Sequence, residues 1–128
     1  MKAAAFAAIR PANLADATAL LADSTARPIG GGQSLGPMLN LRVARPERIV
    51  ALDRLPDLLG AAATEDAVTL GACTTHAAIA DGRTPDIGDF ILAAIAGGIA
   101  YRAVRTRGTI GGSLCHADPA ADRPARTD

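Results

Sequence analysis

The chain has 128 residues, the size of one domain, and a chain of this length buries about two thirds of its surface on folding. Its 13 basic and 13 acidic residues leave no formal net charge, which argues against a nucleic acid or an anionic membrane as partner. Hydrophobic residues make up 49% of the chain, but aromatic residues only 2%, so we expect a closely packed core with modest burial per residue.

The sequence also bears on the cellular compartment and on membrane insertion. No stretch approaches the roughly 20 apolar residues that a membrane span needs. The apolar run after Met1 is short, rich in alanine and stopped by Arg10 and Pro11, so it does not predict a signal peptide. Two cysteines, Cys73 and Cys115, are too few to indicate a disulfide framework. These features predict a cytoplasmic protein.

A strand and an amphipathic helix open the chain. Residues 6–9 predict a short strand, which Pro11 ends. Asn13 is a favoured N-cap residue, and Asp16 stands in the first helical turn, where the helix dipole favours negative charge. Apolar residues recur at helical spacing, namely Leu14, Ala17, Leu20 and Leu21.

A glycine cluster, IGGGQSLGP at residues 29–37, follows the second expected strand at 27–29. A helix from Leu35 to Arg42 comes next, and Pro46 is expected to end it. Residues 48–52 alternate and are rich in β-branched side chains, which predicts a strand parallel to the one before Gly30. The helical side chains expected to face inward are Met38, Leu39 and Leu41.

The second half begins with a turn at residues 53–58, where we place a subdomain boundary. Between residues 59 and 72, two apolar runs flank Thr64, Glu65 and Asp66, a pattern typical of a β-hairpin. Thr74 or Thr75 is expected to cap a short helix through His76 that Gly82 ends.

A further helix is expected to open at Pro85 and Asp86. An isoleucine recurs at every fourth residue and forms an apolar stripe along this helix. The four isoleucines are Ile87, Ile91, Ile95 and Ile99. Together these patterns predict an α+β fold, with a small parallel βαβ unit over residues 1–53.

A second glycine cluster, GTIGGS at residues 108–113, stands near the end of the chain. Glycines beside hydroxyl residues leave backbone N–H groups free to point at an anion, which indicates phosphate binding in both clusters. Asp118 and Pro119 predict a turn, and Asp122 offers a carboxylate to ribose or ribityl hydroxyls. Neither cluster is a GxGxxG fingerprint, and no Walker lysine is present. The expectation is a diphosphate clasped by amides from two separate bends.

Three other groups of residues carry competing interpretations. Cys73 with His76, and Cys115 with His116, have poor spacing for a zinc site. His116 is expected to line the ligand cleft or to make a structural hydrogen bond. Ser34 is expected to cap a helix and donate to phosphate, because no GxSxG elbow surrounds it. Three arginines follow Tyr101, namely Arg102, Arg105 and Arg107. They are equally well interpreted as phosphate-binding groups and as a solvated face beside a helix end.

Two segments, GGGQSLGPMLNLRVARPERIVAL and YRAVRTRGTIGGSLCHADPAADRPA, closely resemble the FAD-binding medium subunit of molybdenum hydroxylases, the carbon monoxide dehydrogenase and xanthine dehydrogenase family. The resemblance implies the bilobal PCMH-type FAD-binding domain, in which FAD lies extended between two α+β lobes. It implies no catalytic residue and no metal ligand in this chain. The implied cofactor-binding residues are Ile29, Gly30, Gly31, Gly32, Gln33, Ser34, Leu35, Gly36, Ile99, Thr109, Ile110, Gly111, Gly112, Ser113 and Asp122.

In that family the flavin subunit carries electrons and does not transform the substrate. A large subunit with molybdenum cofactor oxidises the substrate, and a small subunit relays the electrons through iron-sulfur clusters. The resemblance therefore implies these two partners, FAD as cofactor, and an external electron acceptor, which is NAD, quinone or oxygen. It implies a role in a molybdenum-containing dehydrogenase, an oxidoreductase.

Two departures from the family's pattern stand out. Ser113 occupies the place of an asparagine in many members, a change common in the branch similar to carbon monoxide dehydrogenase. Family members are also more than twice as long, so the chain resembles an N-terminal fragment. Residues 1–53 would be the first lobe and residues 54–128 the truncated start of the second. The alternatives are a non-catalytic remnant or assembly module that does not retain FAD, and a stand-alone flavin oxidase.

Overall fold

A three-stranded parallel sheet organises the first half of the protein. The structure, a computed structural model, describes residues 1–119. Strands β1 (Ala7–Ile9), β2 (Ala26–Ile29) and β3 (Arg48–Ala51) follow the order β1-β3-β2. In the register, Ile9 faces Val50 and Ile29 faces Ala51 across the ladders. The predicted α+β class and the parallel βαβ unit are confirmed.

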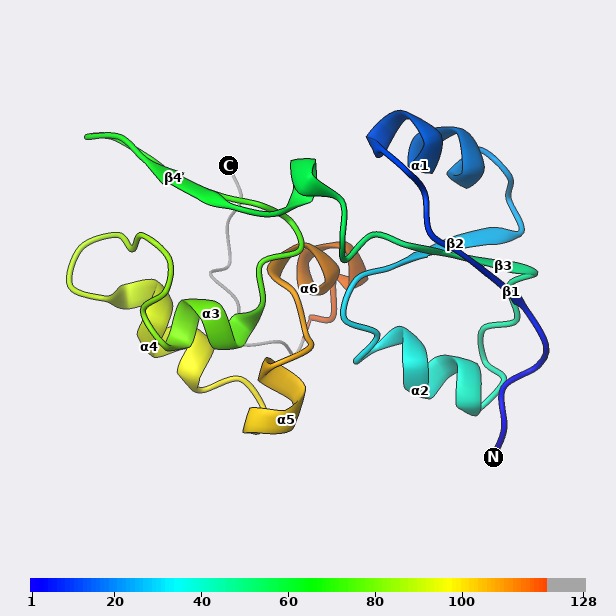
Figure 1. The fold of residues 1–128 in the computed structure, drawn as a ribbon. Coiled ribbons are helices and arrows are strands. Elements are labelled where there is room, and N and C mark those ends of the chain that lie inside the picture. The colour runs from blue at the N-terminus through cyan, green and yellow to red at the C-terminus, as the bar shows by residue number, and fades with distance from the viewer. Residues whose placement is uncertain (120–128) are drawn as a thin grey trace.

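Two helices cover opposite faces of this sheet, with α1 (Leu14–Leu21) above it and α2 (Leu35–Asn40) below it in Figure 1. Asn13 caps α1 as predicted, since its side-chain oxygen accepts a hydrogen bond of 2.8 Å from the N–H of Asp16. The core against α1 is small and dense because alanines allow close approach. It consists of Ala17, Ala26, Val50 and Leu55.

Helix α2 is shorter than the sequence indicated. It ends at Asn40, and the chain turns at Arg42, whose φ is 57°. The N–H groups of Val43 and Ala44 both donate to the carbonyl of Met38, which closes the turn well before Pro46. The expected inward orientation of Leu41 is wrong, because this side chain follows the helix and is 61% exposed.

The segment between the two halves contains a 3-10 helix, η1 (Pro56–Leu58). Leu55, at its start, is 3% exposed and belongs to the core under α1, and Leu58 packs against the same cluster. The turn at residues 53–58 is therefore tied to the first sheet. The subdomain boundary that we placed there stays a prediction.

An antiparallel hairpin and a capped helix follow, both as predicted. Strands β4 (Ala61–Ala63) and β5 (Val68–Leu70) pair with each other. Thr75 begins α3 (His76–Ala80), because its side-chain oxygen accepts from the N–H of Ala78 at 3.1 Å. The chain leaves the helix at Gly82, where φ is 70°.

Helix α4 (Ile91–Gly97) begins later than predicted, so Ile87 and Ile99 lie outside it. Phe90 precedes the helix with φ of 59°, which blocks a helical path from Pro85. Asp86 nevertheless caps the helix from a distance, since its carboxylate accepts from Leu92 and Ala93 at 2.8 Å. Desolvation raises the pKa of this carboxyl, but the backbone N–H donors outweigh it and leave the pKa below its ordinary value.

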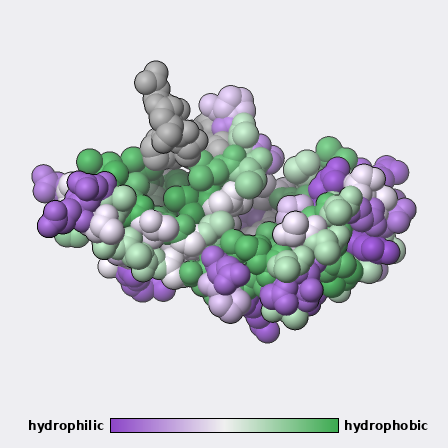
Figure 2. Space-filling model, turned by 90° about the horizontal axis from the view of Figure 1, so that it is seen from above, coloured by the Kyte–Doolittle hydropathy of each residue, from purple (hydrophilic) through white to green (hydrophobic). Residues whose placement is uncertain are grey.

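Two short helices near the end of the chain were not predicted. They are α5 (Arg102–Arg105) and α6 (Ile110–His116), and α6 lies between the sheet and the α3–α5 group in Figure 1. Large hydrophobic side chains reach the surface in both halves, and Figure 2 shows hydrophobic residues widely exposed on one face. Within residues 1–119, every helix is too short to cross a membrane.

Candidate functional site

The two glycine clusters lie against each other. A Cβ added to Gly30 would stand 2.8 Å from the side-chain oxygen of Thr109. A Cβ on Gly31 would stand 1.7 Å from the carbonyl oxygen of Arg107, which no rotation of a side chain could relieve. Glycine is thus required at Gly31 by the close approach of two backbones. Segments far apart in the sequence form one site at this contact.

The first glycine cluster presents its backbone N–H groups. The amides of residues 30–35 donate no hydrogen bond to any atom of residues 1–119. Gly32 adopts φ of 71°, and its carbonyl accepts from Gly36 at 2.8 Å, so the loop is folded back on itself. Ser34 does not cap α2 with its side chain, in contrast to the prediction. The loop therefore offers consecutive donors to a ligand.

Gly36 leaves room beside this loop. Apart from its chain neighbours and the backbone of its own helix, no atom of residues 1–119 lies within 4 Å of the position that a Cβ would take there. Its φ is not in the left-handed region either, so packing within the described residues gives no reason for glycine. A ligand that approached the loop from this side would use that space.

The second glycine cluster is the first turn of α6 and not an open loop. Thr109 is buried and caps the helix, accepting at 3.1 Å from the N–H of Gly112. The N–H of Ile110 donates to Thr74, and the N–H of Gly111 donates to Ala72 at 2.8 Å. The expectation of bare amides here is wrong, because the antiparallel bridge between Thr75 and Thr109 turns them toward residues 72–75.

A buried histidine meets the second cluster at Ser113. The imidazole Nε2 of His76 lies 3.0 Å from the Ser113 hydroxyl, and the His76 side chain is 5% exposed. Burial lowers the pKa of His76, which favours the neutral ring near pH 7. A ring nitrogen at this distance fixes the orientation of the hydroxyl. The sequence does not predict this contact, because nothing local pairs His76 with Ser113.

The remaining predicted residues are placed as follows. Ile99 is half-buried just after α4, and its carbonyl accepts from Arg105. Asp122 lies outside the described residues, so the structure gives no position for it. Arg102 forms a two-pronged ion pair with Asp81 at 2.6 and 2.7 Å, which commits it to α3 and not to a phosphate.

The zinc reading finds no support in the part of the chain that is described. There, no three side chains of histidine, cysteine, aspartate or glutamate gather to hold a metal ion. Cys73 is buried beside the Leu52 carbonyl, and burial, with the nearby Asp53 charge, raises the pKa of its thiol. Cys115 is exposed and unbridged.

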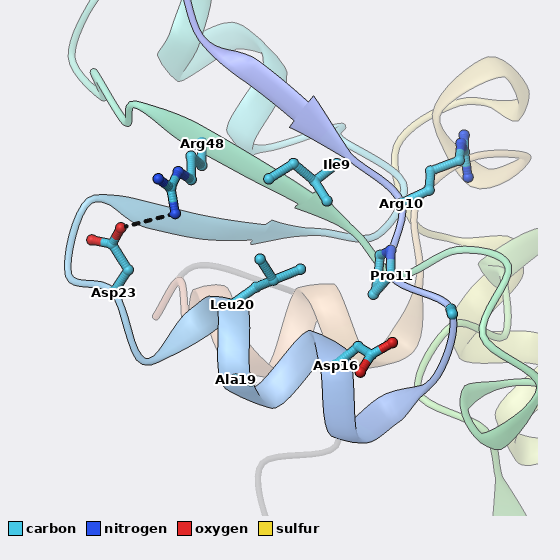
Figure 3. A pocket seen from close by; sticks show the side chains of 9 residues that line it. Ile9, Arg10, Pro11, Asp16, Ala19, Leu20, Asp23 and Arg48 are labelled. Atoms are coloured by element: carbon cyan, nitrogen blue, oxygen red, sulfur yellow. Dashed lines mark ion pairs between the residues drawn. The ribbon is translucent and has the colours of Figure 1, made fainter.

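A shallow groove of about 590 Å³ lies elsewhere, between α1 and strands β1 and β3 (Figure 3). Ile9 and Leu20 line it, and Arg48 pairs with Asp23 across 3.4 Å at one end. None of the residues of either glycine cluster lines this groove. It is therefore separate from the site formed by the two clusters.

Residues 4–127 match the family described as the FAD binding domain in molybdopterin dehydrogenase. The chain belongs to this family. It is 40% identical over 126 residues to the 6-hydroxypseudooxynicotine dehydrogenase complex subunit alpha of Paenarthrobacter nicotinovorans, covering 97% of this chain and 43% of that protein. It is 38% identical to the carbon monoxide dehydrogenase medium chain of Hydrogenophaga pseudoflava, covering 90% and 41%.

Solved structures agree with the family. Carbon monoxide dehydrogenase from Hydrogenophaga pseudoflava superposes with a TM-score of 0.87 at 35% identity, covering 98% of this chain and 44% of that one. Quinoline 2-oxidoreductase from Pseudomonas putida 86 gives a TM-score of 0.84 at 37% identity, covering 92% and 42%. The chain thus spans about two fifths of the length of these relatives, and it carries the fold of their FAD-binding domain.

The site fits the cofactor of this family. FAD carries a diphosphate, and consecutive amides at residues 30–35 match such an anion in number and chemistry. The space beside Gly36 leaves the loop accessible. FAD is therefore the cofactor to which the geometry of this domain is suited.

Proposed function

We propose that the N–H groups of residues 30–35 hold the diphosphate of FAD. The observation that supports this proposal is that these amides, in a folded loop, have no partner among residues 1–119. The second cluster acts through close packing and its hydroxyls, because its first amides are already paired. Ile29, Gly36, Ile99 and Asp122 complete the proposed contacts, as the family resemblance implies. The proposed lobes remain residues 1–53 and 54–128.

We further propose that the protein is the electron-transferring flavin subunit of a molybdenum-containing dehydrogenase. FAD, when bound, can take electrons singly and release them in pairs. The chain's own residues bind and orient the cofactor. The partners are a large subunit with molybdenum cofactor and a small subunit with iron-sulfur clusters, and electrons leave to an external acceptor. The two unbridged cysteines are consistent with a cytoplasmic location.

One alternative is a remnant or assembly module that folds without retaining FAD. The observation in its favour is that the amides of Ile110 and Gly111 in the second cluster are already paired with Thr74 and Ala72. In that case the loop at residues 30–35 would stay free of flavin in the assembled complex. The absorbance of bound flavin separates the two proposals directly.

The test compares two glycine substitutions in the complete protein with its partner subunits. Gly36→Ala places a methyl group in the open space beside the loop, and we expect the affinity for FAD to fall about tenfold or more. Gly97→Ala is the matched control, because a Cβ there also meets no atom of the described residues outside its own helix, but lies at the end of α4. It should retain flavin fully and make α4 slightly more stable.

Flavin content is measured by absorbance after gel filtration and by titration with FAD. Wild-type flavin retention with loss in Gly36→Ala alone supports the proposed site. Equal flavin retention by both variants would place the diphosphate elsewhere. A colourless wild-type complex that takes up no added FAD would favour the remnant.

A further inference from the structure

An unusual backbone turn links α4 to α5. Ala100 adopts φ of 45°, in the left-handed region that a residue with a side chain rarely enters. The turn follows Ile99, for which we proposed contact with FAD. Glycine would adopt this conformation without strain, yet glycines stand two and three residues earlier, at Gly98 and Gly97. Something other than intrinsic preference must therefore hold Ala100.

The side chain of Arg105 holds this turn. Its Nη1 donates to the carbonyl oxygen of Ile99 at 2.9 Å and to that of Ala100 at 3.1 Å. Hydrogen bonds from a charged donor are stronger than neutral ones, and positive charge is favourable just beyond the C-terminus of α4. The Nε of Arg105 is buried and has no partner among residues 1–119. The Nη1 group of Arg105 is thus committed to the turn.

The same short stretch of chain connects this turn to the glycine contact. The N–H groups of Val104 and Arg105 donate to Tyr101, which closes α5 directly after the turn. Arg107, two residues beyond Arg105, places its carbonyl oxygen against Gly31. A turn that opened at Ala100 would displace Ile99 on one side and the start of α5 on the other.

We propose that Arg105 is a positioning residue of the FAD site, which keeps Ala100 in the left-handed conformation and thereby fixes Ile99 toward the cofactor. This inference rests on the proposed function, because it takes Ile99 as a cofactor contact. The side-chain hydrogen bonds of Arg105 go to the carbonyl oxygens of Ile99 and Ala100 and not to either glycine cluster. Its effect on FAD is therefore indirect and passes through the backbone of the turn.

The test is a mutant cycle in the complete protein with its partner subunits. Arg105→Met removes both hydrogen bonds, and we expect FAD to bind about tenfold more weakly. Ala100→Gly alone should leave the affinity near that of wild type, because the turn is already formed. In the double variant glycine adopts the turn without Arg105, so most of the affinity should return. Arg83→Met, which removes an exposed charge just after α3, is the control and should not change the affinity.

Hydrogen exchange of the peptide covering residues 99–107 gives a second readout that needs no FAD. Arg105→Met should speed exchange there, and Ala100→Gly in the same background should slow it again. Arg105→Lys, which keeps the charge, provides a milder variant if Arg105→Met does not fold. Normal FAD affinity and normal exchange in Arg105→Met would overturn the inference, and so would a double variant no better than Arg105→Met. A wild type that takes up no FAD would instead refute the proposed function, while the exchange data would still decide whether Arg105 holds the turn.

Discussion

Two glycines of the candidate site, Gly31 and Gly36, differ in their surroundings. A side chain at Gly31 would collide with the backbone at Arg107, whereas one at Gly36 would meet no described protein atom. The sequence predicts the same role for both glycines, in a loop whose backbone N–H groups are free to point at an anion. The structure separates them, because Gly31 is needed for backbone contact and Gly36 leaves space. This distinction depends on a partner segment more than 70 residues away, which no local pattern contains.

His76 makes the stability of the protein depend on pH. Burial lowers the pKa of His76 in the folded state, so the unfolded chain binds more protons just below pH 6.5, the ordinary value for histidine. The contribution of His76 to the free energy of unfolding is therefore fully present above about pH 6.5. It is lost as the pH falls from there toward the lowered pKa of the folded state. The slope for one proton is at most about 1.4 kcal/mol for each pH unit.

Urea unfolding of the complete protein at several values between about pH 7.5 and 5 checks this dependence. His76→Gln should remove the His76 part of the slope, at some cost in stability at pH 7. His116→Gln, at an exposed position of α6, is measured in parallel as the matched histidine substitution. A slope that survives in His76→Gln would show that another group is responsible.

At the scale of elements, helix caps and the hairpin could be predicted from local sequence. Contacts between segments far apart in the chain could not. Asn13 and Thr75 cap α1 and α3 as their residue types indicated. The hairpin of β4 and β5 also followed from its own alternation and turn. Helix α6 was missed because its glycines read as a loop, and its start depends on the bridge between Thr109 and Thr75.

Thr109 should therefore determine how well α6 begins. Thr109→Val keeps the size of the side chain but removes the oxygen that accepts from Gly112, which should cost about 1 kcal/mol of unfolding free energy. Thr109→Ser keeps the acceptor. Hydrogen exchange at Gly112 should be faster in Thr109→Val than in wild type and close to wild type in Thr109→Ser. Equal protection in both variants would mean that the cap does not hold the helix.

At the scale of the whole molecule, the two halves meet at the contact between the two glycine clusters. The sheet half contributes Gly30 and Gly31, and the helical half contributes Arg107 and Thr109. The sequence predicted which segments would share a site, because both carry the same residue types and a family resemblance joins them. It did not predict that the first segment would leave its amides unpaired among residues 1–119, while Ile110 and Gly111 of the second would donate theirs to Thr74 and Ala72.

The most direct test of the proposed diphosphate site is an experimental structure of the complete protein with FAD bound. We expect diphosphate oxygens within about 3.2 Å of several backbone nitrogens of residues 30–35, while the amides of Ile110 and Gly111 keep their bonds to Thr74 and Ala72. A diphosphate held away from residues 30–35, with those amides turned to water or to protein, would contradict it.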